Sequence, residues 1–177
     1  MKKALFTITV ISSTLFLAAC APSATEETIT QTTTIEPGSF LLSEAPGNAL
    51  PVAEIVKTGS PGDSVVVEGV IGGLLHPFTQ GYASFVLGDD AIVYCNEMAE
   101  PDHCPTPWDA CCVDSDILKA SRLVIQMLDQ QGMPLETDLK SSLSLKELDK
   151  LIIVGEVAKG STPSNVIINA SGIYRKI

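Results

Sequence analysis

Runs of β-branched and aliphatic residues, separated by turns, predict a small β-domain in the later two-thirds of the chain. Glycine, proline, aspartate and asparagine gather between these runs, as they do in tight turns. Five strands are expected from this pattern, at residues 64–71, 82–87, 122–128, 151–158 and 166–174. A short additional apolar run, 91–95, follows the second strand.

Two segments of the pattern need a decision between helix and strand. Residues 122–128 could continue a helix from 116–119, but Leu123, Ile125 and Met127 alternate with more polar positions. The turn-like Asp129–Gly132 after them favours a strand that enters a hairpin-like turn. Residues 144–150 are expected to form a short helix, because Ser144 and Glu147 have the spacing of a capping box.

The order of three strands, a short helix and two strands resembles the OB-fold, a five-stranded Greek-key barrel with a helix between its third and fourth strands. The resemblance covers about residues 60–177, and Gly72-Gly73 at the end of the first strand fits the bend of that fold. Another small β-sandwich or barrel is the alternative. We therefore expect a mainly β, OB-fold-like barrel with one short helix and a cysteine-rich insertion. A resemblance of architecture carries little information about function.

The first twenty residues have the layout of an export signal. Lys2 and Lys3 precede a nearly uncharged apolar run that is too short for a transmembrane helix. Leu17-Ala18-Ala19-Cys20 at its end resembles the lipobox of bacterial lipoproteins. That resemblance implies cleavage before Cys20 and acyl chains on its sulfur and on the new amino terminus. An ordinary secretory signal with a chance cysteine is the alternative.

The chain is therefore divided into a lipoprotein signal peptide at 1–19, a flexible tether at 20–50 and the OB-fold-like domain at 51–177. The tether is assigned because its Ser, Thr, Glu and Pro residues bury too little apolar surface to offset the entropy of ordering. We expect a location in the cell envelope, on the periplasmic side or at the outer membrane.

Charge narrows the range of partners. The chain has 11 basic and 21 acidic residues, a net charge of −10, and loss of Lys2 and Lys3 with the signal would make it −12. Phosphate backbones and anionic headgroups repel such a protein. Nucleic-acid binding is therefore not expected, and membrane attachment must depend on acyl chains. An envelope protein, a peptide or a glycan is the expected kind of partner, and no cofactor is expected.

Four cysteines remain beyond Cys20, all in or beside an insertion at about 96–116. The stretch Cys104-Pro105-Thr106-Pro107-Trp108-Asp109-Ala110-Cys111-Cys112 resembles a CPTPWD-x-CC segment of uncharacterised exported proteins that also have an OB-like domain. An even set of exported cysteines predicts two disulfides. A bond between adjacent cysteines would strain the peptide between them. This leaves Cys95–Cys111 with Cys104–Cys112, or Cys95–Cys112 with Cys104–Cys111, and the sequence does not decide between them.

A metal site is the alternative use of the same segment. Cys95, His103, Cys104, Cys111 and Cys112 are its candidate ligands, because thiolates and imidazole suit zinc or copper(I). The sequence has no C-x2-C knuckle and no H-x3-H pair to strengthen this hypothesis.

The remaining candidates lie in the loop after the first strand. His76, Phe78 and Tyr82 could line a ligand pocket, since this loop often borders the ligand face of an OB-fold. The alternative is that Phe78 closes one end of the barrel and His76 is solvated. No G-x-S-x-G motif or phosphate-binding glycine loop is present. We therefore predict a non-enzymatic, lipid-anchored binding or structural module, with envelope metal binding as the alternative.

Overall fold

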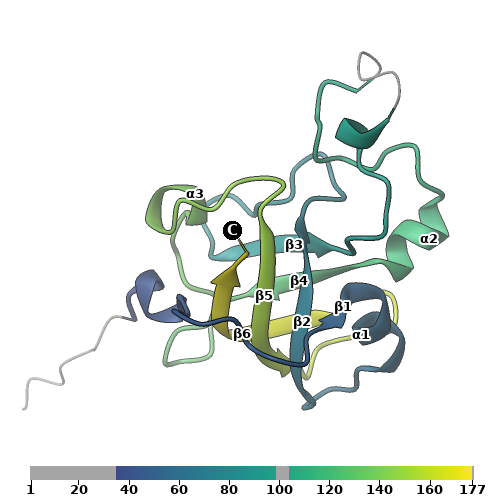
Figure 1. Ribbon diagram of the computed structural model, residues 1–177. Helices are drawn as coiled ribbons and strands as arrows, with labels where there is room; N and C mark the ends of the chain where they lie inside the picture. Colours follow the sequence, from purple (N-terminus) through teal and green to yellow (C-terminus); the bar gives the residue numbers. More distant parts are fainter. Residues whose placement is uncertain (1–34, 99–103, 177) are drawn as a thin grey trace, which may run out of the picture. The chain divides into compact units, whose positions relative to one another are not determined.

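A closed five-stranded β-barrel is the main feature of the computed structural model, which describes residues 35–98 and 104–176 (Figure 1). Its strands are β2 (Ser64–Ile71), β3 (Ser84–Gly88), β4 (Arg122–Gln126), β5 (Lys150–Val157) and β6 (Ile167–Arg175). The mainly β, OB-fold-like architecture expected from the sequence is confirmed.

The pairing closes the barrel in the order β2-β3-β4-β6-β5 and back to β2. Every pair is antiparallel except β4 with β6, which is parallel. The longest ladder joins β2 to β5, from Ser64 opposite Glu156 to Val70 opposite Lys150. The ladder between β5 and β6 shifts register after Val154, where Gly155 accommodates the bulge.

Alternation along the strands fills the barrel with aliphatic and aromatic side chains. In β4, Leu123 and Ile125 are buried while Arg122, Val124 and Gln126 are only half-buried. This is the two-residue period that the sequence predicted for a strand rather than a helix. Phe85 of β3 is also buried, and it lies among the largest side chains of the core.

The segment before the barrel packs on it from Pro37 onward. A 3-10 helix, η1 (Pro37–Phe40), places Phe40 in the main core, and Leu42 N–H donates to the carbonyl of Ile173 at 2.8 Å. Further on, β1 (Leu50–Pro51) pairs parallel with β2 and leads into α1 (Val52–Thr58). The expected domain start at residue 51 is therefore too late, since residues of the assigned tether belong to the barrel's packing. Residues 1–34 lie outside the described part, and so do the expected signal and Cys20.

The short helix between the third and fourth barrel strands is α3 (Leu139–Ser142), so the prediction of a helix at 144–150 is wrong. Asp138 caps α3 by accepting from Ser141 N–H at 3.0 Å. The chain then leaves the helix, because Ser144 has a positive φ of 53°. Leu143 and Leu145 are nevertheless both buried, which explains why the segment has an apolar pattern without forming a helix. None of the helices in the described residues is long and apolar enough to span a membrane.

The cysteine insertion lies between β3 and β4, as expected, and forms a small structure of its own. It contains the 3-10 helix η2 (Cys95–Glu97) and the helix α2 (Ser115–Ala120). The expected apolar run at 91–95 is not a strand. Two of its buried side chains, Ile92 and Tyr94, pack instead with Val70 and Ala110 in a second hydrophobic core.

Strand β2 forms the wall between the two cores. Ile71 belongs to the main core, whereas its neighbour Val70 belongs to the second one. Successive side chains of a strand point to opposite faces, so the end of β2 contributes side chains to both cores.

Candidate functional site

Three thiols come together in the insertion. The sulfur atoms of Cys95, Cys104 and Cys111 all lie within 4.8 Å of one another. Cys111 Sγ is 3.5 Å from Cys104 Sγ and 3.7 Å from Cys95 Sγ. Cys95 is buried, Cys104 is half-buried and Cys111 is exposed, so the group extends from the interior of the insertion to its surface.

Backbone hydrogen bonds hold the two cysteine-bearing segments side by side. Cys95 N–H donates to the Asp109 carbonyl at 2.8 Å, and Asn96 N–H donates to the Pro107 carbonyl at 3.0 Å. Residues 95–96 and 107–109 are thus joined by hydrogen bonds, although Cys95 and Cys111 are far apart in the sequence. This pairing brings the sulfur of Cys95 towards that of Cys111.

The same segment is fixed to the barrel through the end of β2. Gly73 N–H donates to the Trp108 carbonyl at 2.9 Å, and the Trp108 indole N–H donates to the Leu75 carbonyl at 3.1 Å. Gly72 allows this close approach, because a Cβ atom there would lie 2.6 Å from the Trp108 oxygen. The segment that carries Cys104 and Cys111 is therefore fixed to the residues that follow β2.

Tyr94 anchors the other side of the site. Its ring is buried in the second core, and its hydroxyl donates to the Asp89 carbonyl at 3.0 Å. Burial, and then the negative charge of Asp89, raise the pKa of Tyr94, which stays protonated as a donor. Asp89 in turn accepts from Ala53 N–H at 2.7 Å, near the start of α1, and from Ala91 N–H at 2.9 Å. The buried carboxylate therefore ties the insertion to the helix beside β1.

The three thiols differ in acidity. Hydrogen bonds from Cys95 and Thr106 lower the pKa of Cys104 to about 7, whereas hydrogen bonding to Cys104 and then Cys95 raises the pKa of Cys111 to about 12. Burial raises the pKa of Cys95. Without a metal, Cys104 is thus the readily formed thiolate, with two protonated neighbours. A bound cation would favour the thiolate form of all three.

The other members of the expected ligand set are placed differently. Cys112 is exposed, and its sulfur lies 3.9 Å from Cys111 Sγ but not within 4.8 Å of all three clustered sulfurs. His103 lies outside the described residues. All four described cysteines are free thiols, so neither of the two expected disulfide pairings is formed among them.

The loop candidates do not converge on a pocket. Phe78 packs against Phe85 with ring centroids 6.1 Å apart, and Lys140 Nζ lies 5.1 Å from the centre of its ring. His76 and Tyr82 are exposed. This placement matches the alternative in which Phe78 closes the barrel, since its ring joins the edge of the main core.

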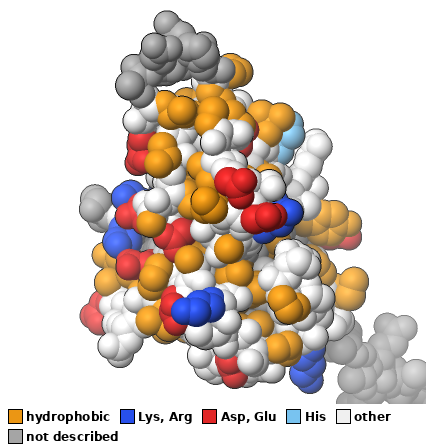
Figure 2. Space-filling view, turned by 90° about the vertical axis from the view of Figure 1, so that its right-hand side faces the viewer, with side chains coloured by type: hydrophobic (Ala, Val, Ile, Leu, Met, Phe, Trp, Pro, Cys, Tyr) orange, Lys and Arg blue, Asp and Glu red, His pale blue; other side chains and the backbone are white. Residues whose placement is uncertain are grey.

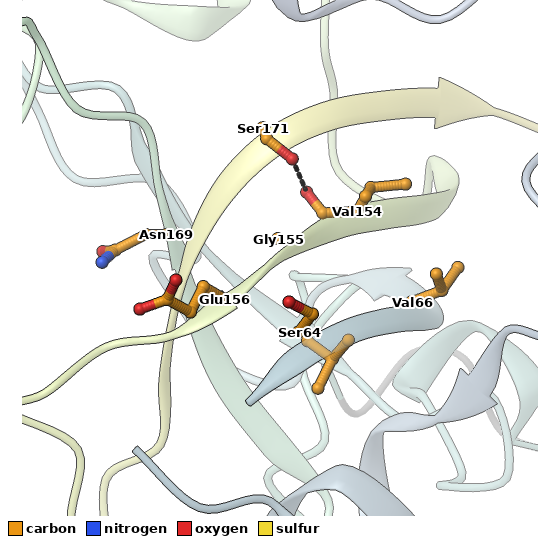
Figure 3. Close-up of a pocket in the computed structure, with 8 residues that line it drawn as sticks. Ser64, Val66, Val154, Gly155, Glu156, Asn169 and Ser171 are labelled. Carbon is orange, nitrogen blue, oxygen red and sulfur yellow. Dashed lines mark hydrogen bonds between the residues drawn. The ribbon is translucent and has the colours of Figure 1, made fainter. Parts of the chain in front are cut away.

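An open groove on the outer barrel surface is a second candidate. It has a volume of about 470 Å³ and is lined by parts of β2, β5 and β6, with Glu156 and Asn169 at one side (Figure 3). The Asn169 side chain already accepts from Gln126 at 2.7 Å, and the Ser171 hydroxyl donates to the Val154 carbonyl. Few polar groups are left for a ligand, so the groove is the weaker candidate.

The surface around the insertion is partly apolar. Hydrophobic side chains are visible at its end of the molecule, the upper end in Figure 2. Leu75, Val93, Met98 and Ile117 are exposed large hydrophobic residues in this region of the chain. Cys111 and Cys112 are thus exposed in a part of the chain that also exposes large apolar side chains.

Sequence reasoning missed the residues that position the thiols. Thr106 hydrogen-bonds Cys104, with 3.5 Å between Thr106 Oγ1 and Cys104 Sγ, and the Asp109 and Pro107 carbonyls receive the N–H groups of η2. Backbone acceptors have no sequence signature, although the two prolines did indicate a stiff loop.

No family model, curated protein or solved structure matches the chain significantly.

Proposed function

We propose that this chain is a lipid-anchored protein of the cell envelope whose barrel domain binds a thiophilic metal ion, zinc or copper(I), through Cys95, Cys104 and Cys111. The observation that supports the proposal is the mutual approach of three sulfur atoms within 4.8 Å. The barrel is the scaffold, and the insertion is the binding part. The role is binding, and no catalytic step is assigned.

The spacing of the sulfurs fits a shared ion. Zinc–sulfur bonds are about 2.3 Å long, so two sulfurs on a tetrahedral ion lie about 3.8 Å apart. The distances from Cys111 to Cys104 and Cys95, 3.5 and 3.7 Å, are near this value. They are much longer than the bond of about 2.05 Å in a disulfide.

The arrangement also favours a metal over two disulfides. Cys111 is the shared neighbour of Cys95 and Cys104, and it can form a disulfide with only one of them. Each of the two expected pairings then requires Cys112 to reach the remaining cysteine, although the contact that Cys112 makes is with Cys111. A metal ion uses all three clustered sulfurs at once.

The location rests on the lipobox resemblance at Cys20 and is tested separately. Replacement of Cys20 by alanine is expected to release the protein from the membrane fraction. A Cys20→Ala variant that still sediments with membranes would refute the lipid anchor without affecting the metal proposal.

Metal binding is tested by titrating the reduced, metal-free protein with Cu(I) and with Zn²⁺ under anaerobic conditions. We expect one ion per chain. The Cys104→Ser variant should lose more than about 100-fold in affinity, since even outer-shell changes cost 10–100-fold. The matched control is Cys112→Ser, which removes a cysteine outside the group of three. The proposal fails if the natively isolated protein contains four blocked thiols and no metal, or if Cys104→Ser binds as tightly as the unchanged protein.

A further inference from the structure

Given the proposed metal site, the described residues would leave one side of the ion open. Structural zinc sites are closed by four protein ligands, whereas sites that exchange a ligand keep a position free. Within the described residues only three sulfurs, those of Cys95, Cys104 and Cys111, lie within 4.8 Å of one another. The innermost, Cys95, is 3% exposed, and the outermost, Cys111, lies at the surface. The open side of the ion would thus be next to Cys111.

Cys112 lies beside that opening. Its sulfur is 3.9 Å from Cys111 Sγ, a separation at which two thiolates can share one ion. Two ligands with bonds of about 2.3 Å can be at most about 4.6 Å apart. Because Cys112 Sγ is not within 4.8 Å of all three clustered sulfurs, it cannot complete their set without movement. It can, however, hold an ion together with Cys111.

We propose that Cys112 is the thiol through which the ion enters and leaves the site of Cys95, Cys104 and Cys111, so that the domain passes a thiophilic ion to acceptors by ligand exchange. In each step one metal–sulfur bond forms as another breaks. The entering thiol gives its proton to solvent, and the displaced thiolate takes one up. The metal keeps its oxidation state, so no oxidant or reductant is needed.

The four cysteines become less exposed along the proposed path of the ion into the site. Cys95 is buried, Cys104 is half-buried, and Cys111 and Cys112 are exposed. An ion that moves from Cys112 and Cys111 to the full site passes from solvent towards the second core. An acceptor thiol approaching from solvent would meet Cys112 and Cys111 first.

The test loads one equivalent of Cu(I) onto the reduced protein without oxygen and follows its transfer to a chromogenic Cu(I) chelator by stopped-flow absorbance. Cys112→Ser is expected to keep its equilibrium affinity within about threefold but to slow transfer about tenfold or more, because a hydroxyl does not replace a soft ligand. Cys112→Met is the matched variant. Its thioether binds Cu(I), so transfer should be faster than in Cys112→Ser.

The outcomes separate this inference from the proposed function. An unchanged transfer rate in Cys112→Ser overturns the exchange role while the metal site stands. A loss of affinity equal to that of Cys104→Ser also overturns it, since Cys112 would then be an ordinary ligand. Failure of the unchanged protein to bind Cu(I) or Zn²⁺ overturns the metal site itself and the exchange role with it.

Discussion

Replacing Gly72 by alanine is expected to loosen the cysteine insertion while leaving the barrel strands paired. The new methyl group would lie 2.6 Å from the Trp108 carbonyl oxygen and 3.0 Å from Cε1 of Tyr94. To restore an ordinary contact of 3.4 Å, the carbonyl has to retreat by about 0.8 Å, which lengthens its 2.9 Å hydrogen bond from Gly73 N–H beyond a useful distance.

The size of the effect follows from these two changes. Overpacking of a tight contact costs about 1–3 kcal/mol, and the lost hydrogen bond adds about 1 kcal/mol. We therefore expect a decrease of about 2–4 kcal/mol in the free energy that holds the insertion closed. Since about 1.4 kcal/mol corresponds to a factor of ten, the open form becomes at least about 30 times more populated.

Thiol reactivity measures this opening directly. Cys95 is 3% exposed, so its reaction with a disulfide reagent such as DTNB should be a slow phase, behind that of the half-buried Cys104, whose thiolate forms readily, and that of the exposed Cys112. This Cys95 phase, identified by peptide mass spectrometry, should become at least about 30 times faster in Gly72→Ala. Gly160→Ala is the matched control, because no atom lies within 4 Å of its added Cβ. If the slow phase is the same in both variants, the contact between Gly72 and Trp108 does not hold the site.

Three further variants or measurements test other parts of the structure. Asp89→Ala should lower the free energy of unfolding in urea by about 2–3 kcal/mol, because two partly buried N–H groups lose the carboxylate that accepts from them, and an Asp89→Asn variant should lose less. Phe85→Ala should cost about 3–5 kcal/mol in the same assay, and a cost below about 1 kcal/mol would show that the main core is assigned wrongly. Because the thiolate is the nucleophile, iodoacetamide should alkylate Cys104 in the reduced, metal-free protein with a midpoint near pH 7, the rate falling at lower pH, while Cys111 reacts only in strong alkali. Peptide mass spectrometry across pH 5–9 checks this order, which fails if Cys111 is modified first.

The strands were predictable because one physical signal, burial on alternate sides, determines them. Leu123, Ile125 and Met127 are all buried on one side of the chain, as their spacing predicted. The helix between the third and fourth strands was misplaced because Ser144 and Glu147 have capping-box spacing, although Ser144 has a positive φ. A capping box is a local preference, and burial of Leu143 and Leu145 outweighs it here.

The boundary of the domain and the thiol group depend on contacts that the sequence does not encode locally. Phe40 begins a short apolar run, Phe40-Leu41-Leu42, in an otherwise polar segment, and its packing partners in the barrel show that it belongs to the core. The sequence identified four cysteines of the insertion but not which three meet. Their meeting is set by the backbone bonds of Cys95 and Asn96 to residues far along the chain.

Because β2 separates the two cores, the insertion can open without the barrel unfolding, and hydrogen exchange can measure this opening. Since the second core is formed by only a few side chains, amides around Ala110 can become labile through a local opening that leaves the β2–β5 ladder protected. One aliphatic substitution at Ile92 would then adjust how often the insertion opens without touching the cooperative unit formed by the barrel. Under the metal-binding proposal, retention of the ion and stability of the barrel would then be separately adjustable.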